Sequence, residues 1–366
     1  MEDIQQLLFS RSVCGCAGSQ SSLFTLSCKP LLLLFSLSME TLEEAELCFP
    51  HLLNISCKRQ LQNRGPTIFV YVILSCISLL TVMLNLLVII AISHFRQLHT
   101  TTNLLLLSLA VADFLVGLLL MPGQIILITG CWFLGSLTCA LFNYLSCILT
   151  SASVGTIVLI SVDRYVAICD PLSYSTKVTH QRVQISVCVC WACSLFYNAV
   201  MLHVFLEKPD AHNSCYGECI VVIDLITGAV DLVLTFVGSI AVIVVLYIKV
   251  FVVAVSQARA MRSHITAVTV QGSVTVNANQ SVRKAARILG IVVAVFVICL
   301  CPCFFPSLTG MSPSSAFLNF GLWLLYCNSC INPVIYASFY PWFRRSIFLI
   351  VTLQILRYDS CDSHIL

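Results

Sequence analysis

Charged residues are scarce in this sequence. Lysine and arginine together number 19 and aspartate and glutamate 16, so only 10% of the 366 residues carry a charge, while 59% are hydrophobic. The mean hydropathy is +0.97. A chain with so few charges cannot cover a water-soluble globule of this size with a polar surface. The composition therefore excludes an ordinary soluble domain and indicates that lipid solvates much of the chain.

Other features are missing from the sequence, and each absence argues against a class of protein. The net charge is only +3 and the basic residues fall in short clusters between apolar segments, which argues against a nucleic-acid partner. No set of His, Cys and Asp residues lies at metal-ligand or catalytic spacing in an aqueous segment, so nothing supports an enzyme. Internal repeats and broken apolar segments, which are expected of a transporter or channel, are also absent from the sequence.

Cysteine, in contrast, is abundant, with 21 residues. Many of these residues lie inside apolar runs, where cysteine behaves as a small buried thiol. Such cysteines are Cys188, Cys190, Cys193, Cys299, Cys301 and Cys303. We therefore expect disulfides only among the cysteines that lie outside the membrane.

Seven apolar stretches are long enough to cross a membrane as helices, since a hydrocarbon core about 30 Å thick requires roughly 20 helical residues. Their approximate bounds are Thr67–Ser93, Thr102–Leu127, Leu137–Val162, Val183–Phe205, Val221–Ala254, Ala285–Leu308 and Ser315–Tyr336. The predicted fold class is an all-α membrane protein, a seven-transmembrane helix bundle. The stretch Tyr340–Phe348 has arginines on one side and aromatic residues on the other, which predicts a short amphipathic helix after the seventh span.

The basic residues indicate the orientation of the bundle. They concentrate in the connections after the first, third and fifth spans and in the tail, whereas the other connections are acidic. Because Lys and Arg favour the cytoplasmic side, we expect a multi-pass plasma-membrane protein with its N-terminus outside the cell. The sequon that begins at Asn54 would then lie in the compartment where N-glycosylation occurs.

These predictions divide the chain into four segments. Residues 1–38 fit poorly with the rest: a weak apolar core allows a signal segment, but a second start at Met39 makes a gene-model extension the favoured interpretation. Residues 39–66 are then an extracellular N-terminal segment, and residues 67–338 are the seven-helix domain. Residues 339–366 form the amphipathic helix and the cytoplasmic tail.

Two short motifs end the third and seventh spans. Asp163-Arg164-Tyr165 closes the third span, and Asn332-Pro333-Val334-Ile335-Tyr336 closes the seventh. Together with Trp191 in the fourth span, this combination resembles the rhodopsin-like G-protein-coupled receptors. In such a receptor the arginine is held by the neighbouring carboxylate at rest and released to a G protein when the bundle opens. The resemblance implies that Asp163, Arg164, Tyr165 and Tyr336, with Tyr247, Phe296 and Pro302, form the coupling switch.

Polar residues within the spans are costly, at about 2.5–3.5 kcal/mol for an Asp at a helix centre, so each requires a reason. The polar positions in question are Asp113, Asn85, Ser153, Asn328 and Asn332. They resemble the receptor pattern that builds a hydrated sodium pocket beneath the ligand, which would make sodium an allosteric modulator and leaves no other cofactor or metal implied. A hydrogen-bonded structural network without an ion is the alternative.

Several further runs are similar to the trace amine-associated receptors, in wording typical of the fish branch. The seventh span from Asn328 to Phe343 carries the strongest similarity, and the resemblance covers the chain from about Met39 onward. Supporting runs are Cys48–Cys57, His94–His99 and Lys284–Gly290. The resemblance implies a small-amine ligand, an olfactory role, membrane lipid as the surroundings and a stimulatory heterotrimeric G protein that raises cyclic AMP.

The resemblance also implies two disulfides on the outer side. Cys139 is expected to pair with Cys219, and Cys57 with Cys215, and an oxidising compartment favours both. Cys48 and Cys131 are left without an assigned partner.

The sequence departs from most amine receptors at the position of the ligand counter-ion. Ser146 occupies the place in the third span where an aspartate is usual, and a hydroxyl cannot neutralise an ammonium group. Asp231 in the fifth span is the predicted substitute, since at 1.5 Å per residue it lies roughly 27 Å of helix from Lys249 at the inner mouth. The alternative is a tolerated helix-end carboxylate. The resemblance adds Tyr326, Trp323, Cys303 and Phe304 to the cavity, although such aromatic residues often only pack.

Two further departures concern activation. Leu300 stands in the sixth span where a tryptophan is usual, and Ser239 in the fifth where a proline normally creates a bulge. Their loss would retune activation or mark a divergent receptor with impaired signalling. A neurotransmitter-type amine receptor is the near alternative, disfavoured by Ser146, and an opsin is excluded because Ser315–Tyr336 contains no lysine for retinal.

Overall fold

The computed structural model describes residues 45–52, 54–60, 64–207, 213–221, 225–265, 290–306, 315–357 and 360–362. These residues belong to one unit of the chain, Thr41–Leu366. The predicted extension 1–38 lies outside the described residues.

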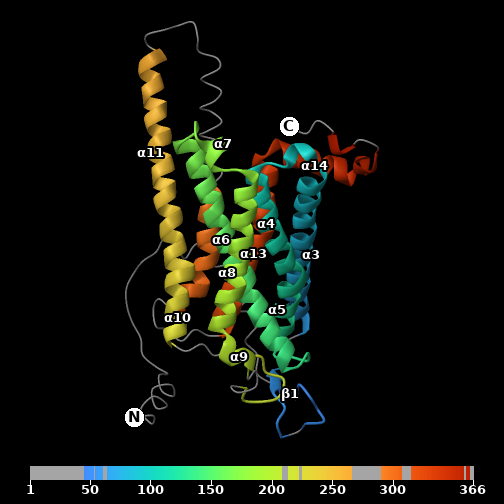
Figure 1. The fold of residues 1–366 in the computed structure, drawn as a ribbon. Helices are drawn as coiled ribbons and strands as arrows, with labels where there is room; N and C mark the ends of the chain where they lie inside the picture. The colour runs from blue at the N-terminus through green and yellow to red at the C-terminus, as the bar shows by residue number, and fades with distance from the viewer. Residues whose placement is uncertain are drawn as a thin grey trace. The chain divides into compact units, whose positions relative to one another are not determined.

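Most of the described chain consists of long apolar helices (Figure 1). Five segments are long and apolar enough to cross a membrane: Thr67–His94, Thr101–Ile128, Ser136–Cys169, His180–Met201 and Ile226–Val253. Gly290–Pro306 is a shorter apolar helix, and the last rod, α13 (Ser315–Phe339), is long but more polar because it contains three asparagines and Pro333. The predicted seven-helix bundle is confirmed.

The first rod is α3 (Arg64–His94), the third is α6 (Ser136–Cys169) and the fourth is α8 (His180–Met201). The second consists of α4 (Thr101–Leu115), the π-helix η2 (Val116–Leu120) and α5 (Met121–Ile128), and the fifth of α10 (Leu225–Asp231), the π-helix η3 (Leu232–Gly238) and α11 (Ser239–Ile265). Short elements complete the described fold: β1 (Ala45–Leu47), β2 (Lys58–Gln60), η1 (Arg96–Leu98), α7 (Tyr174–Lys177), α9 (His203–Glu207), α14 (Pro341–Val351), η4 (Gln354–Leu356) and η5 (Ser360–Asp362).

Several predicted boundaries differ from the structure. The third span was predicted to end at Val162, but α6 continues to Cys169. The fourth span was predicted to reach Phe205, but α8 ends at Met201 and the chain re-enters a helix only in α9. The fifth was predicted to end at Ala254, but α11 continues to Ile265. Polar residues such as Gln257 and Arg259 gave no apolar signal, yet they are good helix formers and so extend the rod.

The core lies where the rods meet, and the lipid-facing surfaces are apolar as well. Val88, Leu109, Ile157 and Leu300 come from four rods and are fully buried in one cluster. Large apolar side chains on the outer faces stay exposed, among them Phe196. Such a surface is unfavourable in water and suits lipid, so packing and exposure agree with the composition.

The fifth rod keeps its wide turn although it lacks the usual proline. The π-helix η3 immediately precedes Ser239, whose hydroxyl donates to the carbonyl of Leu234 at 3.4 Å. A side-chain donor of this kind can occupy a backbone acceptor that a wide turn leaves unpaired. The usual proline is therefore not required for a wide turn in this rod.

After α13, the chain turns into the amphipathic helix α14, close to the predicted position. Trp342 and Phe343 are buried against the bundle, while Arg344 is exposed and donates to the carbonyls of Ala337 and Ser338 at 3.0 and 3.1 Å. A cation at the last carbonyls of a helix satisfies acceptors that the helix itself leaves unpaired. This cap fixes where α13 ends.

Three disulfides hold together the opposite end of the bundle, called here the disulfide end. The antiparallel pair β1 and β2 lies there (Figure 1). Cys57 is bonded to Cys215 and Cys139 to Cys219, the two pairings that the sequence implied. A third bond joins the two cysteines that had no assigned partner, Cys48 and Cys131. The N-terminal segment is thus fastened both to the turn after α5 and to the loop before α10.

We expect the bond between Cys48 and Cys131 to stabilise the receptor measurably. It joins residues 83 positions apart, and native disulfides that close long loops contribute typically about 2–4 kcal/mol to the free energy of unfolding. Cys131→Ser should therefore lower the midpoint of thermal unfolding by several degrees, and non-reducing peptide mapping should find Cys48 linked to Cys131 in the unmodified protein. Alkylation of Cys131 as a free thiol, with Cys139 still linked to Cys219, would contradict the pairing.

Candidate functional site

Asp231 is the last residue of α10, near the disulfide end of the fifth rod. Its Oδ1 atom accepts hydrogen bonds from the hydroxyl of Tyr197 on α8 at 3.1 Å and from the hydroxyl of Thr235 at 2.8 Å. Both donors are neutral. In the described part of the chain no basic side chain pairs with Asp231, and no hydrogen bond is described for Oδ2. The two hydrogen bonds to Oδ1 thus orient the carboxylate and leave Oδ2 able to accept a hydrogen bond from a ligand.

A second group of predicted residues lies between the third and seventh rods. The hydroxyls of Ser146 on α6 and Tyr326 on α13 are 3.0 Å apart and hydrogen-bonded. The Trp323 ring lies edge-on to that of Tyr326, with ring centroids 6.4 Å apart. Both aromatic side chains are buried. Among the described residues, the indole Nε1–H of Trp323 has no hydrogen-bond acceptor, so it can donate to another group.

The thiol of Cys147 lies near both of these groups. The electrostatic neighbours of Cys147, which follows Ser146 on α6, include Asp231. Those of Tyr326 include both Cys147 and Cys303. Phe304, the residue after Cys303, stacks on Phe236 of the fifth rod at a centroid distance of 4.8 Å. Residues of the third, fifth, sixth and seventh rods therefore surround one region with a carboxylate at one side.

Deeper in the bundle, the predicted polar network is partly assembled. Asn332 donates to Oδ2 of Asp113 at 2.8 Å, and Asn85 donates to the carbonyl of Ser329 at 2.9 Å. Ser329, which the sequence did not single out, also lies beside Asp113. The predicted residues Ser153 and Asn328 are buried, but no hydrogen bond to Asp113 is described for either of them.

Several side-chain oxygen atoms of this network have no described hydrogen-bond donor. Within the described residues, Oδ1 of Asp113, Asn85, Asn328 and Asn332 are all buried without a donor. Four orphaned oxygen acceptors are costly in a low-dielectric interior, and a hard cation such as sodium prefers oxygen ligands. The residues present therefore fit a sodium ion held by Asp113 and the neighbouring amides, as an alternative to water.

At the α14 end, Asp163 holds Arg164. The guanidinium Nε–H donates to Oδ2 of Asp163 at 3.0 Å, and Arg164 also contacts the hydroxyl of Thr102. Thr102 and Tyr174 donate to the same carboxylate at 3.0 and 2.8 Å. Thr102 and Tyr174 were not predicted, because they lie in other helices and no motif marks them. Arg164 is thus held by a carboxylate that is itself fixed by two hydroxyls.

The other predicted switch residues lie in the third, fifth, sixth and seventh rods. The Nζ atom of Lys249 lies 5.8 Å from the centre of the Tyr165 ring. Tyr336 is buried with no described partner for its hydroxyl. The Tyr247 hydroxyl lies so close to Gly290 of the sixth rod that a larger residue at that position would displace it. Phe296 is buried in the core and Pro302 is partly buried in the same helix.

The connection after α6 carries an exposed ion pair. Lys177 donates to Asp170 at 2.6 Å. This hydrogen bond, with a second from Ser173, holds the pKa of the Asp170 carboxyl below its usual value. Because both partners are exposed to solvent, the pair contributes little to stability.

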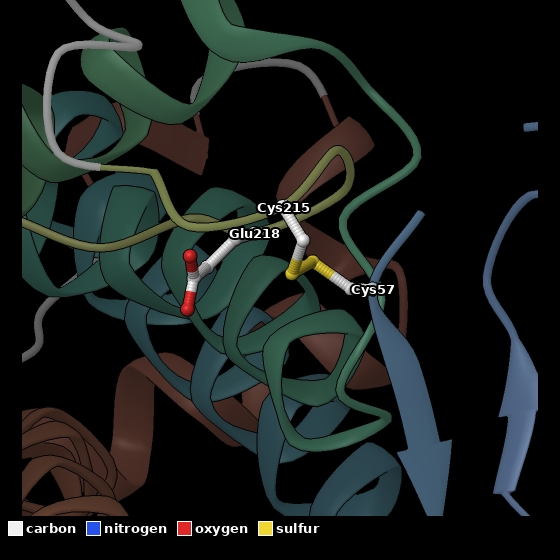
Figure 2. A group of neighbouring side chains, drawn as sticks. All are labelled: Cys57, Cys215 and Glu218. Carbon is white, nitrogen blue, oxygen red and sulfur yellow. A yellow bond between two sulfur atoms is a disulfide. The ribbon is translucent and has the colours of Figure 1, made fainter. Parts of the chain in front are cut away.

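A cluster with metal-ligating atoms lies at the disulfide end. The sulfurs of Cys57 and Cys215 and a carboxylate oxygen of Glu218 lie within 4.8 Å of one another (Figure 2). Metals bind the thiolate form of cysteine, and here both sulfurs are consumed by the disulfide. This cluster is therefore not a metal site, and Glu218 is left as a carboxylate beside a disulfide.

The predicted sequon lies at the same end of the bundle. The side chain of Asn54 is exposed in a turn between β1 and β2. The hydroxyl of Ser56 accepts a hydrogen bond from the backbone of Phe49 at 2.8 Å and so closes the turn. This exposure is compatible with glycosylation of Asn54, which stays a prediction.

The sequence is similar to those of a known family of receptors. Residues 84–336 match the family described as 7 transmembrane receptor (rhodopsin family). The chain is 38% identical over 342 residues to trace amine-associated receptor 13c of Danio rerio, an alignment that covers 89% of this chain and 98% of that protein. It is 35% identical over 323 residues to trace amine-associated receptor 1 of Mus musculus, covering 85% of this chain and 96% of that protein. The human receptor of that name is 32% identical over 324 residues, covering 85% and 95% respectively.

Sodium is expected to stabilise the purified protein through Asp113. Replacing choline chloride with sodium chloride at the same ionic strength should raise the midpoint of thermal unfolding by roughly 2–4 °C, the shift produced by a ligand at several times its dissociation constant. In Asp113→Asn the shift should disappear, because the anionic ligand is lost. An equal sodium shift in both proteins would show that the four acceptors hold water or rearranged side chains instead.

Proposed function

Because the chain belongs to the trace amine-associated receptors of the rhodopsin family, receptors rather than enzymes, we propose that it detects small protonated amines through Asp231. The names of the relatives associate them with trace amines. For this chain the proposal includes volatile amines as ligands, an olfactory role, and signalling through a stimulatory G protein and cyclic AMP. The seven-helix domain would lie in the plasma membrane with the disulfide end outside the cell.

The single observation that carries this proposal is the state of the Asp231 carboxylate. Two neutral hydroxyls fix its Oδ1 atom, and no cation neutralises it among the described residues. An ionised carboxylate in a span without a partner is costly, and a ligand ammonium group would compensate it. The hydrogen bonds from Tyr197 and Thr235 orient the group without consuming its charge.

The residues of the third and seventh rods near Asp231 support the same class of ligand. Tyr326 and Trp323 present a hydroxyl, an indole and two aromatic rings, which suit the body of a small amine. Ser146 is already hydrogen-bonded to Tyr326, so its place in the cavity is that of a neutral partner. Cys303 and Phe304 would contribute apolar contacts from the sixth rod. A neurotransmitter-type amine receptor is the alternative, and the absence of a carboxylate at Ser146 disfavours it.

Signal transfer would depend on Arg164. In this structure Asp163 holds the arginine, which is the arrangement expected of a resting receptor. Ligand binding would favour an open bundle in which Arg164 leaves Asp163 and contacts the G protein, with Tyr165, Tyr247 and Tyr336 repacking around it. A sodium ion at Asp113 would favour the resting state.

The residues proposed for ligand binding and for the switch are present despite the departures at Leu300 and Ser239. Leu300 is fully buried and packs in the same core cluster as Phe296, and Ser239 follows an intact wide turn. Impaired signalling is the outcome that Leu300 would favour, since a leucine has fewer contacts to repack below the ligand than a tryptophan. A cyclic-AMP assay against a panel of volatile mono- and diamines distinguishes a working receptor from an impaired one.

Asp231→Asn should weaken amine potency by roughly 10- to 100-fold, because a hydrogen bond to a charged group is worth about 1.5–3 kcal/mol. The substitution keeps the shape of the side chain and removes its charge. Ser146→Ala should change potency by less than about threefold, and so should the control Tyr197→Phe, since Thr235 still orients the carboxylate. Cyclic-AMP dose-response curves at equal surface expression provide the measurement. Full potency in Asp231→Asn would return the ligand class to an open question.

Arg164→Ala should retain amine binding and lose the cyclic-AMP response, since the arginine lies at the α14 end, far along α6 from Ser146. The reciprocal variant Asp163→Asn should raise cyclic AMP without ligand, because it removes the charge that holds Arg164 while keeping the shape of the side chain and one acceptor oxygen. Radioligand binding and basal cyclic AMP measure the two effects. A receptor that signals normally with Arg164→Ala would contradict the proposed switch.

A further inference from the structure

A pocket of about 450 Å³ lies among the loops of the disulfide end. Its walls come from three segments: residues 49 and 54–56 of the N-terminal segment, residues 132, 133, 135 and 136 after α5, and residues 213–218 of the loop before α10. None of the residues assigned to amine binding around Asp231 lines it. This loop pocket is therefore separate from the residues grouped around Asp231.

Aromatic rings form one side of the loop pocket. The ring of Phe49 lies 5.6 Å from that of Phe133 and 4.8 Å from that of Tyr216, measured between centroids. The Phe133 and Tyr216 side chains remain 52% and 53% exposed. Partly exposed aromatic side chains that lie close together can attract organic cations through the negative quadrupole of their ring faces.

The only charged side chain among the described residues that line the loop pocket is Glu218. Its Oε2 atom accepts a hydrogen bond from the backbone N–H of Ser214 at 2.6 Å, which orients the carboxylate. Glu218 and Cys215 come from the same loop, and the disulfide to Cys57 fixes that loop to the N-terminal segment (Figure 2). No hydrogen bond is described for the other oxygen, Oε1. The pocket thus combines partly exposed aromatic side chains with one negative charge.

The walls are held in place before any ligand arrives. The disulfides Cys48–Cys131 and Cys57–Cys215 tie the three segments together. Backbone hydrogen bonds add to this: Trp132 donates to Gly217 at 2.8 Å, and Cys57 donates to Tyr216 at 3.0 Å. Gly217 has a φ of +98°, and a Cβ at this position would lie 2.7 Å from the Phe49 ring, so the loop packs directly on the aromatic side. A preformed site loses little conformational entropy on binding.

We propose that the loop pocket binds the ammonium group of a small organic cation, with Glu218 as counter-ion and Phe49, Phe133 and Tyr216 as the aromatic wall. A bare metal ion is a poorer match, because the neighbouring sulfurs are bonded to each other and the remaining walls are aromatic. The chemical class follows from the lining alone. That the natural occupant is the same amine as at Asp231 rests on the proposed function, and the loop pocket would then be a second, weaker amine site.

The test uses the full-length receptor in lipid nanodiscs, with tetramethylammonium as the probe. Saturation-transfer difference NMR measures binding of the probe. The neutral isostere neopentyl alcohol serves as the uncharged control. Glu218→Gln is expected to weaken probe binding by roughly tenfold, because it removes the carboxylate charge that attracts the probe cation. Tyr216→Leu, which keeps the backbone hydrogen bonds of that residue, should weaken it by roughly two- to fivefold. Leu134→Ala, at an exposed neighbour outside the pocket, should leave it unchanged.

Two further variants test whether the probe binds instead near Asp231, and whether a sugar on Asn54 occupies the loop pocket. Binding of the probe should persist in Asp231→Asn, so that failure of the Asp231 proposal and failure of this one give different results. Probe binding that is unaffected by Glu218→Gln and Tyr216→Leu, in proteins with wild-type surface expression, would overturn the proposal. Binding that emerges only with Asn54→Gln would also overturn it, since an Asn54-linked sugar would then occupy the pocket in the mature receptor.

Discussion

The constraint on which this structure depends is the cost of a carboxylate inside the membrane. Each of the three described carboxylates in the helical rods is compensated differently. Asp163 is paired with Arg164 and fixed by two hydroxyls, Asp113 accepts from an amide and is surrounded by orphaned oxygen atoms, and Asp231 accepts from two neutral hydroxyls. The first is self-sufficient, whereas the other two lack a positive charge. The proposed switch, ion site and ligand site correspond to these three states.

The disulfide end provides the rigidity that the rest of the bundle lacks. Helices in lipid have no hydrophobic driving force between them and can shift against one another, which activation requires. The three disulfides instead fix the loops to the N-terminal end of α6, to the turn after α5 and to the N-terminal segment. Because these loops keep a fixed shape, ligand binding would instead move the helices relative to one another. The movement would reach the α14 end of the bundle, where Arg164 lies.

The sequence predicted those parts of the fold and site that depend on composition and local pattern. Apolar length located the seven rods, and the motifs located Asp163, Arg164 and Asn332. Contacts across helices could not be predicted in this way, because Tyr197 and Thr235 are ordinary residues until α8 and η3 bring them to Asp231. The same holds for the bond between Cys48 and Cys131, whose partners are far apart in the chain. Ser239 shows a further limit: the sequence does not reveal that, without the usual proline, a side-chain hydroxyl donates to a backbone carbonyl of the wide turn.

The central claim, that Asp231 is the counter-ion of an amine, is tested most directly by an experimentally determined structure of the receptor with an activating primary amine bound. The account predicts the ligand nitrogen within hydrogen-bonding distance of Asp231 Oδ2, about 2.7–3.0 Å, with Tyr197 and Thr235 still donating to Oδ1 and the ligand body against Tyr326 and Trp323. A nitrogen bound elsewhere, with Asp231 contacting only Tyr197 and Thr235, would contradict it.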